Sequence, residues 1–330
     1  MNKTLILIAI LALTTLNFNK LDGQARIKSG LAPIIMWRIP ITTVLGNSAD
    51  LMRFSKKIKY NKFDFDTGSA IPISFLYRDS VFYIPNVVKG IILGYNKSGR
   101  LITKNIFPDS TTLGFIAINS KGNYVSNNYF DRTLTEWNPM SEKILQRSRT
   151  SSPFIFTSSK GECYYLNGNS LINEEASDKL NLPQNNQWFS EAYTSLSINS
   201  SNIFITHFED FEWKLEIIGL RNDSLKTIQL DSSLNMYTAM KIISSTSNEV
   251  VGLFVNESNG EALIETIGAT SGKVINSREI TYPEFPEPGF AGEIFSWPDG
   301  VVYSYNPVES RLYAMSLNSK YMSMYYYQLK

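Results

Sequence analysis

The chain has 330 residues, 31 of them basic and 30 acidic, with a single histidine and a single cysteine. A net charge of +1, without a basic cluster, gives no broad electrostatic attraction to nucleic acid or to an anionic membrane. With only Cys163, no intramolecular disulfide can form, but a chain of this length buries enough apolar surface to fold without one. We therefore expect no nucleic-acid partner and a fold that is held by its apolar core.

Residues 1–25 resemble a secretory signal peptide. Lys3 precedes the apolar run Leu5–Leu13, and Gly and Ala occupy the −3 and −1 positions of a cleavage site after Ala25. The apolar run is shorter than the roughly 20 residues of a transmembrane helix, although an uncleaved anchor is the alternative. We expect residues 26–330 to be a single domain that is secreted, periplasmic or at the cell surface, with no membrane insertion of the mature chain.

The remaining sequence has the pattern of an all-β protein. Short runs of apolar, β-branched and aromatic residues recur between Gly, Asn, Asp and Ser turns, and no segment of ten or more residues has a helical period. In Gly94–Ile102, an aromatic strand end, a polar turn and an apolar strand follow one another. Variants of this hairpin recur along the chain, at Phe65–Ile71, Trp137–Ile144, Gly268–Val274 and Tyr305–Leu312, with weaker ones at Leu166–Leu171 and Leu220–Lys226.

The strand-like runs fall into groups of four, whose starts lie about 40 to 50 residues apart, as in four-stranded propeller blades. This spacing predicts a β-propeller with seven blades favoured and six as the alternative; a pair of β-sandwiches would need no repeat. We expect the aromatic C-terminal strand Tyr321–Leu329 to close the ring with N-terminal strands. The groups are Ile73–Asn105, Phe115–Arg147, one from Phe154, Ser195–Leu230, Met240–Ile280 and Ile294–Leu317, with Ile34–Ile71 as a seventh blade or as strands that complete the ring.

On the hairpin repeat and the blade spacing, the chain resembles the bacterial secreted β-propellers, in particular the degenerate six- and seven-bladed kind related to NHL and TolB-type repeats. The resemblance covers about residues 30–330. It implies a fold rather than a function, because propellers carry out many functions and no WD, kelch, Asp-box or quinone-cofactor signature is present. It also implies that ligands meet the face with the second-to-third-strand loops and the links between blades.

The loops expected on that face combine aromatic and charged side chains. Such side chains can stack on and hydrogen-bond a sugar or a peptide, although solvated loops whose aromatics pack onto the blades are the alternative. The binding candidates are Tyr129, Asp131, Arg132, Trp188, His207, Glu209, Asp210, Glu284 and Glu287.

Candidates for catalysis are few. His207 is the only histidine, and its place at a strand end suggests a surface or capping role rather than a general base. Cys163 lies in strand-like sequence, which predicts a buried, inert thiol. No nucleophile elbow or calcium loop occurs, so catalytic residues stay unassigned and we expect no cofactor and no metal.

These observations predict a monomeric, non-catalytic binding or scaffold propeller whose ligand is an unidentified protein, peptide or glycan. The alternative is a carboxylate-dependent carbohydrate-active enzyme, a glycoside hydrolase or lyase, on the same fold. That enzyme would need two or three carboxylates within about 5 to 10 Å of one another at the channel mouth.

Overall fold

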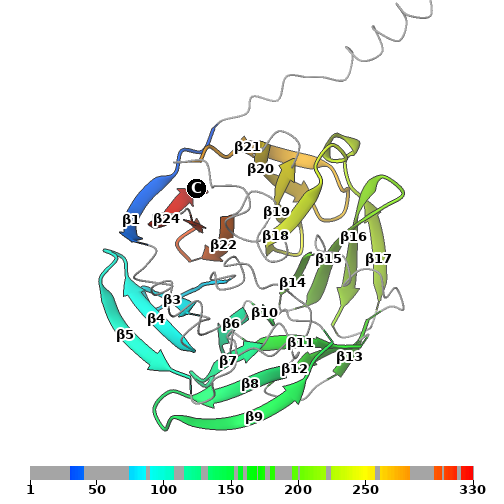
Figure 1. Ribbon diagram of the computed structural model, residues 1–330. Helices are drawn as coiled ribbons and strands as arrows, with labels where there is room; N and C mark the ends of the chain where they lie inside the picture. Colours follow the sequence, from blue (N-terminus) through cyan, green and yellow to red (C-terminus); the bar gives the residue numbers. More distant parts are fainter. Residues whose placement is uncertain are drawn as a thin grey trace, which may run out of the picture.

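The computed structural model describes residues 30–40, 74–86, 90–107, 115–127, 133–151, 155–158, 162–168, 170–174, 179–182, 195–199, 201–220, 224–256, 261–282, 301–306, 308–317 and 321–329. The strands of these residues form six four-stranded antiparallel sheets, which are arranged as blades around a ring (Figure 1). In each blade the first strand lies toward the centre and the last strand lies at the rim. The fold is therefore a β-propeller, as predicted, with six blades.

Five blades use four consecutive strands each, and the sixth combines both ends of the chain. Blade 1 contains β2 (Leu76–Arg78), β3 (Val81–Asn86), β4 (Ile91–Asn96) and β5 (Leu101–Ile106). Blade 2 contains β6 (Phe115–Ile118), β7 (Tyr124–Asn127), β8 (Thr133–Asn138) and β9 (Lys143–Arg149). Blade 3 contains β10 (Ile155–Thr157), β11 (Cys163–Asn167), β12 (Ser170–Asn173) and β13 (Lys179–Asn181). Blades 4 to 6 contain β14 (Ser195–Ile198), β15 (Asn202–Glu209), β16 (Glu212–Gly219) and β17 (Leu225–Gln229); β18 (Ala239–Ser245), β19 (Glu249–Asn256), β20 (Glu261–Gly268) and β21 (Val274–Glu279); and β22 (Val301–Asn306), β23 (Arg311–Leu317), β24 (Tyr321–Gln328) and β1 (Ile34–Pro40). A short 3-10 helix, η2 (Ser232–Leu234), links blades 4 and 5.

The ring closes through β1, which is the outermost strand of blade 6. It runs antiparallel to β24, with Ile34 opposite Tyr326 and Pro40 opposite Tyr321, and the register shifts between Ile35 and Trp37. Closure by the C-terminal strand and an N-terminal strand is thus confirmed. The preference for seven blades was wrong, because the described part of Ile34–Ile71 supplies one strand that completes blade 6. Residues 41–73, which include the expected hairpin Phe65–Ile71, lie outside the described residues.

The apolar core is divided among the interfaces between blades. The buried hydrophobic residues gather in six clusters, and each cluster draws side chains from two neighbouring blades, so that together they run around the ring. Successive residues of a strand serve different interfaces, as side-chain alternation requires. Phe254, for example, faces blade 4, whereas Leu253 and Val255 face blade 6. This double burial explains why β19 is apolar on both faces between Val250 and Val255.

The two ends of the ring carry different connections. Turns between first and second strands and between third and fourth strands lie at one end, which we call the turn face; second-to-third-strand loops and the links between blades lie at the loop face. Several turn-face turns are closed by an asparagine whose Oδ1 accepts backbone N–H groups two to four residues further on, an arrangement that stabilises a chain reversal. Asn96, Asn119, Asn138, Asn199 and Asn306 all do this.

Candidate functional site

Three of the nine binding candidates fall within the described residues. His207 and Glu209 belong to β15, and Asp210 begins the turn to β16. This turn joins the second and third strands of blade 4, so it lies on the loop face. The other six candidates, Tyr129, Asp131, Arg132, Trp188, Glu284 and Glu287, lie outside the described residues.

The β15–β16 hairpin ends in a two-residue turn. Glu209 and Glu212 still face each other in the ladder, so the strands continue further than the sequence indicated, and only Asp210 and Phe211 form the turn. Their φ angles are 53° and 64°, the left-handed backbone of a type I′ turn, for which Asn-Gly is the favoured sequence. The turn leaves the Phe211 side chain 85% exposed, whereas Phe208 packs against Trp213.

Charged side chains at the base of this turn form a cluster, which we call the hairpin cluster: His207, Glu209, Asp210 and Lys214. The ammonium group of Lys214, which lies opposite His207 in the ladder, donates to Oε2 of Glu209 at 2.6 Å and lies 4.0 Å from Oδ2 of Asp210. Nε2 of His207 lies 3.8 Å from the same Glu209 oxygen. The hydrogen bond from Lys214 lowers the pKa of Glu209 and raises the pKa of Lys214.

His207 does not have the surface or capping role that the sequence suggested, because its side chain is only 5% exposed. It is buried on the face of β15 that also carries Glu209. With Glu209 already held as an ion by Lys214, the hairpin cluster has the character of a fixed charge pair rather than of an acid and a base poised for proton transfer.

Sequence reasoning missed Lys214 and Glu216, which share one face of β16. Glu216 is buried, and the Thr227 hydroxyl lies 2.9 Å from each of its carboxylate oxygens. Burial raises the pKa of Glu216 despite this hydrogen bond. The alternation Lys214-Leu215-Glu216 is the sequence signal that could have identified the pair, since period two places both charges on one side of a strand.

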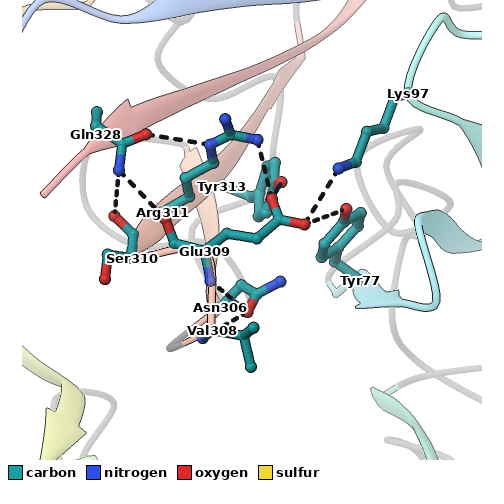
Figure 2. Close-up of polar contacts among 9 residues, drawn as sticks. All are labelled: Tyr77, Lys97, Asn306, Val308, Glu309, Ser310, Arg311, Tyr313 and Gln328. Atoms are coloured by element: carbon teal, nitrogen blue, oxygen red, sulfur yellow. Dashed lines mark hydrogen bonds and ion pairs between the residues drawn. The ribbon is translucent and has the colours of Figure 1, made fainter. Parts of the chain in front are cut away.

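A second polar cluster lies on the turn face, between blade 6 and blade 1 (Figure 2). We call it the seam cluster, and it consists of Tyr77, Lys97, Glu309, Arg311 and Tyr313. Oε1 of Glu309 accepts hydrogen bonds from the Tyr77 hydroxyl at 2.9 Å and from the Lys97 ammonium group at 3.1 Å. Oε2 accepts from Nη1 of Arg311 at 2.9 Å and from the Tyr313 hydroxyl.

Four donors fix the protonation state of Glu309. Burial alone would raise its pKa, but the hydrogen bonds from Tyr313, Lys97 and Tyr77 outweigh this effect and lower the pKa from 4.5 to about 2. Burial, reinforced by the hydrogen bond to Glu309, raises the pKa of Tyr313. A carboxylate with both oxygens engaged and such a low pKa does not exchange protons near neutral pH, so the seam cluster has a structural character.

The described innermost strands show what lines the ring at its centre. Their sequences contain hydroxyl, aromatic and aliphatic residues, and the charged residues among them are Arg78 and Lys241. Both cations cross to the next blade: Nη1 of Arg78 donates to the carbonyl oxygens of Ile118 and Asn119, and Nζ of Lys241 donates to that of Tyr303. These six strands therefore do not supply the carboxylate pair that a carbohydrate-active enzyme would need.

Cys163 is buried, as predicted, and forms no disulfide. The described residues contain no group of three or more His, Cys, Asp or Glu side chains that could hold a metal ion. They also contain no helix with the length and hydrophobicity that a membrane span requires.

No family model matches the chain, and no curated protein matches it. Solved structures with a similar arrangement include virginiamycin B lyase from Staphylococcus aureus, which is 11% identical with a TM-score of 0.44 over 77% of this chain and 84% of that chain. A putative exported protein from Bacteroides fragilis is 10% identical, with a TM-score of 0.44 over 80% and 93% of the two chains. The WD40 domain of Neurospora crassa Pan2 is 9% identical, with a TM-score of 0.47 over 78% and 75%.

These similarities are too distant to carry a functional argument. The resemblance to β-propeller proteins is confirmed at the level of fold, and the six four-stranded sheets assign that fold directly. The chain is a six-bladed β-propeller.

Proposed function

We propose that this protein is an exported, non-catalytic binding or scaffold propeller that contacts a protein, peptide or glycan through its loop face. The observation that carries the proposal is the tip of the β15–β16 hairpin, where Phe211 is exposed between the carboxylates of Asp210 and Glu212. An aromatic face flanked by hydrogen-bond acceptors suits the recognition of a sugar ring or of a peptide that carries donors.

The backbone of this tip supports a binding role. A non-glycine residue with positive φ costs roughly 1 kcal/mol, and two such residues follow each other at Asp210 and Phe211. A two-residue turn of this type has a fixed geometry, so the exposed ring of Phe211 is held at a defined position. Here the Lys214–Glu209 ion pair and the packing of Phe208 on Trp213 hold the hairpin immediately below the turn.

Export is part of the same proposal, and the N-terminal sequence supports it. The charged start, the apolar run and the cleavage site after Ala25 are the features of a secretory signal peptide. We propose that the mature protein begins at residue 26 and acts outside the cytoplasm as a single domain and a monomer.

Binding assays on the purified protein test the proposal. We expect a specific hit on a glycan or peptide array and a loss of roughly tenfold or more in affinity for that hit in Phe211→Ala, because the aromatic contact is removed. Met140→Ala is the matched control, since Met140 is as exposed as Phe211 but lies on the turn face. Wild-type affinity in Phe211→Ala would exclude the hairpin tip as the contact, and no specific hit on either array would count against a binding role.

A further inference from the structure

The carboxylate of Glu309 joins the C-terminal part of blade 6 to blade 1. Its Oε1 atom faces donors from blade 1, namely Tyr77 in β2 and Lys97 in the turn after β4 (Figure 2). Its Oε2 atom faces donors from blade 6, namely Arg311 and Tyr313 in β23. One carboxylate therefore links strands near the C-terminal end of the chain to the first blade that follows β1.

The surroundings hold both the turn and one of the donors in place. Oδ1 of Asn306 accepts the backbone N–H of Glu309, and the side-chain amide of Gln328 donates to the carbonyl oxygen of Glu309 at 3.2 Å. Nε of Arg311 donates to the same Gln328 side chain, and the Arg311 guanidinium lies 4.4 Å from the ring centre of Tyr326. These contacts do not involve the Glu309 carboxylate, so the position of Arg311 does not depend on it.

Two further features define the site chemically. The Tyr313 ring is fully buried against Phe82 and Tyr77, so its hydroxyl depends on an acceptor at this position. The Glu309 side chain is nevertheless 24% exposed, so a small solute can reach the position of its carboxylate. Two cations and two phenols directed at one point suit a carboxylate better than a neutral group.

We propose that Tyr77, Lys97, Arg311 and Tyr313 form a carboxylate-binding site that is divided between blade 6 and blade 1. Glu309 is its resident occupant, and its hydrogen bonds hold blade 6 against blade 1 in the closed ring. Replacing Glu309 by alanine removes atoms equivalent to one acetate ion. The site is then vacant but preformed, and free acetate takes the place of the missing side chain.

The test combines hydrogen exchange, thermal unfolding and chemical rescue on the full chain. In Glu309→Ala we expect the amides of β2 and β23 to exchange roughly tenfold faster and Tm to fall by roughly 5 °C, while β15 and β16 are unchanged. Sodium acetate should reverse more than half of the increase in exchange rate and more than half of the fall in Tm. Equal concentrations of sodium chloride or of the neutral isostere acetamide should not. Glu249→Ala is the matched control, because Glu249 is an exposed glutamate beside a turn-face turn of blade 5.

A Glu309→Ala variant that acetate stabilises no more than chloride does would overturn the carboxylate site. Unchanged amide exchange in β2 and β23 would contradict the claim that Glu309 holds blade 6 against blade 1. If Glu309→Ala does not fold, a double-mutant cycle between Tyr77→Phe and Glu309→Gln tests the same contact between the two blades. Non-additive losses in Tm are expected across the seam, and additive losses would contradict the proposal. None of these measurements involves a ligand of the loop face, so their outcome is independent of the proposed binding role.

Discussion

Glu216 and Glu309 show how the same side chain acquires opposite properties in one fold. Glu309 has four donors, and its ionised form is stabilised. That contribution is present above its ordinary pKa of 4.5 and is lost as the pH falls toward 2. Glu216 is more deeply buried and has the single hydroxyl of Thr227, which can donate to only one oxygen at a time. Its raised pKa means that ionisation of Glu216 opposes folding.

We expect Glu216→Gln to stabilise the protein at pH 7 by about 1 kcal/mol, because the amide keeps an acceptor for Thr227 and removes a buried charge. Because the folded-state pKa of Glu216 is raised, the protonated carboxyl group favours the folded state. This contribution is full below pH 4.5 and is lost as the pH rises through the folded-state pKa of Glu216. The stability gain of the variant should therefore shrink toward pH 4. Urea unfolding at pH 4 and pH 7 measures both quantities. Equal gains in stability at the two pH values, or a loss of stability at pH 7, would show that the ionised Glu216 carboxylate does not destabilise the folded protein.

At the scale of elements, the turn-face hairpins do more than reverse the chain. The β4–β5 turn is closed by Asn96, and Gly99 adopts a φ of 77° within it. A Cβ atom built on Gly99 would lie 2.7 Å from the Trp37 side chain in β1, which belongs to blade 6. The hairpin of blade 1 is therefore fitted against the closing strand of the ring, beside the seam cluster to which it contributes Lys97.

Gly99 and Gly122 provide a matched pair for testing this fit. Both have positive φ in turn-face turns, but the space around Gly122 is open. We expect Gly122→Ala to cost about 1 kcal/mol from backbone strain alone. Gly99→Ala should cost at least about 1 kcal/mol more, because Trp37 must also move. Chemical denaturation of both variants gives the comparison, and equal losses would mean that the contact with Trp37 is unimportant.

The hairpins and most of the blades were predictable because their signals are local. Gly94–Ile102 gives strand, turn and strand within nine residues, and four of the strand groups begin and end within three residues of the observed blades. The blade count stayed open between seven and six, since no local signal shows whether Ile34–Ile71 forms a blade of its own or supplies a strand that pairs with β24 at the other end of the chain. The seam cluster was missed for the same reason, because Tyr77 and Glu309 are 232 residues apart. Only His207, Glu209 and Asp210 of the predicted site could be placed.

At the scale of the whole molecule, the six apolar clusters make every blade depend on two neighbours. Each blade buries one face in each of two interfaces, so no blade is terminal and no capping repeat is needed. The interface between blades 6 and 1 carries Trp37, Tyr313 and two methionines of β24 among its buried residues. Chain connectivity contributes least within blade 6 itself, because its neighbouring strands β1 and β24 belong to opposite ends of the chain.

Deleting Ile34–Pro40 tests the role of the closing strand. The deletion removes Trp37 from the interface and leaves β24 as an unpaired edge, so we expect Tm to fall by roughly 10 °C and the protein to self-associate. Thermal unfolding and size-exclusion chromatography with light scattering at several concentrations measure the two effects. A monomeric variant with the Tm of the wild type would show that the ring does not need β1.

The pairing of β1 with β24 also affects how the protein is made. The ribosome produces β1 long before β24, so β1 has no partner strand until β24 has been made. A chain that ends early, or that is cut before Tyr321, leaves the apolar surfaces meant for blade 6 uncovered, where proteases and chaperones recognise them. For a protein that we propose to be exported, the same order keeps the ring open until β24 has followed β1 across the membrane. Ring closure thus requires that both β1 and β24 have been made.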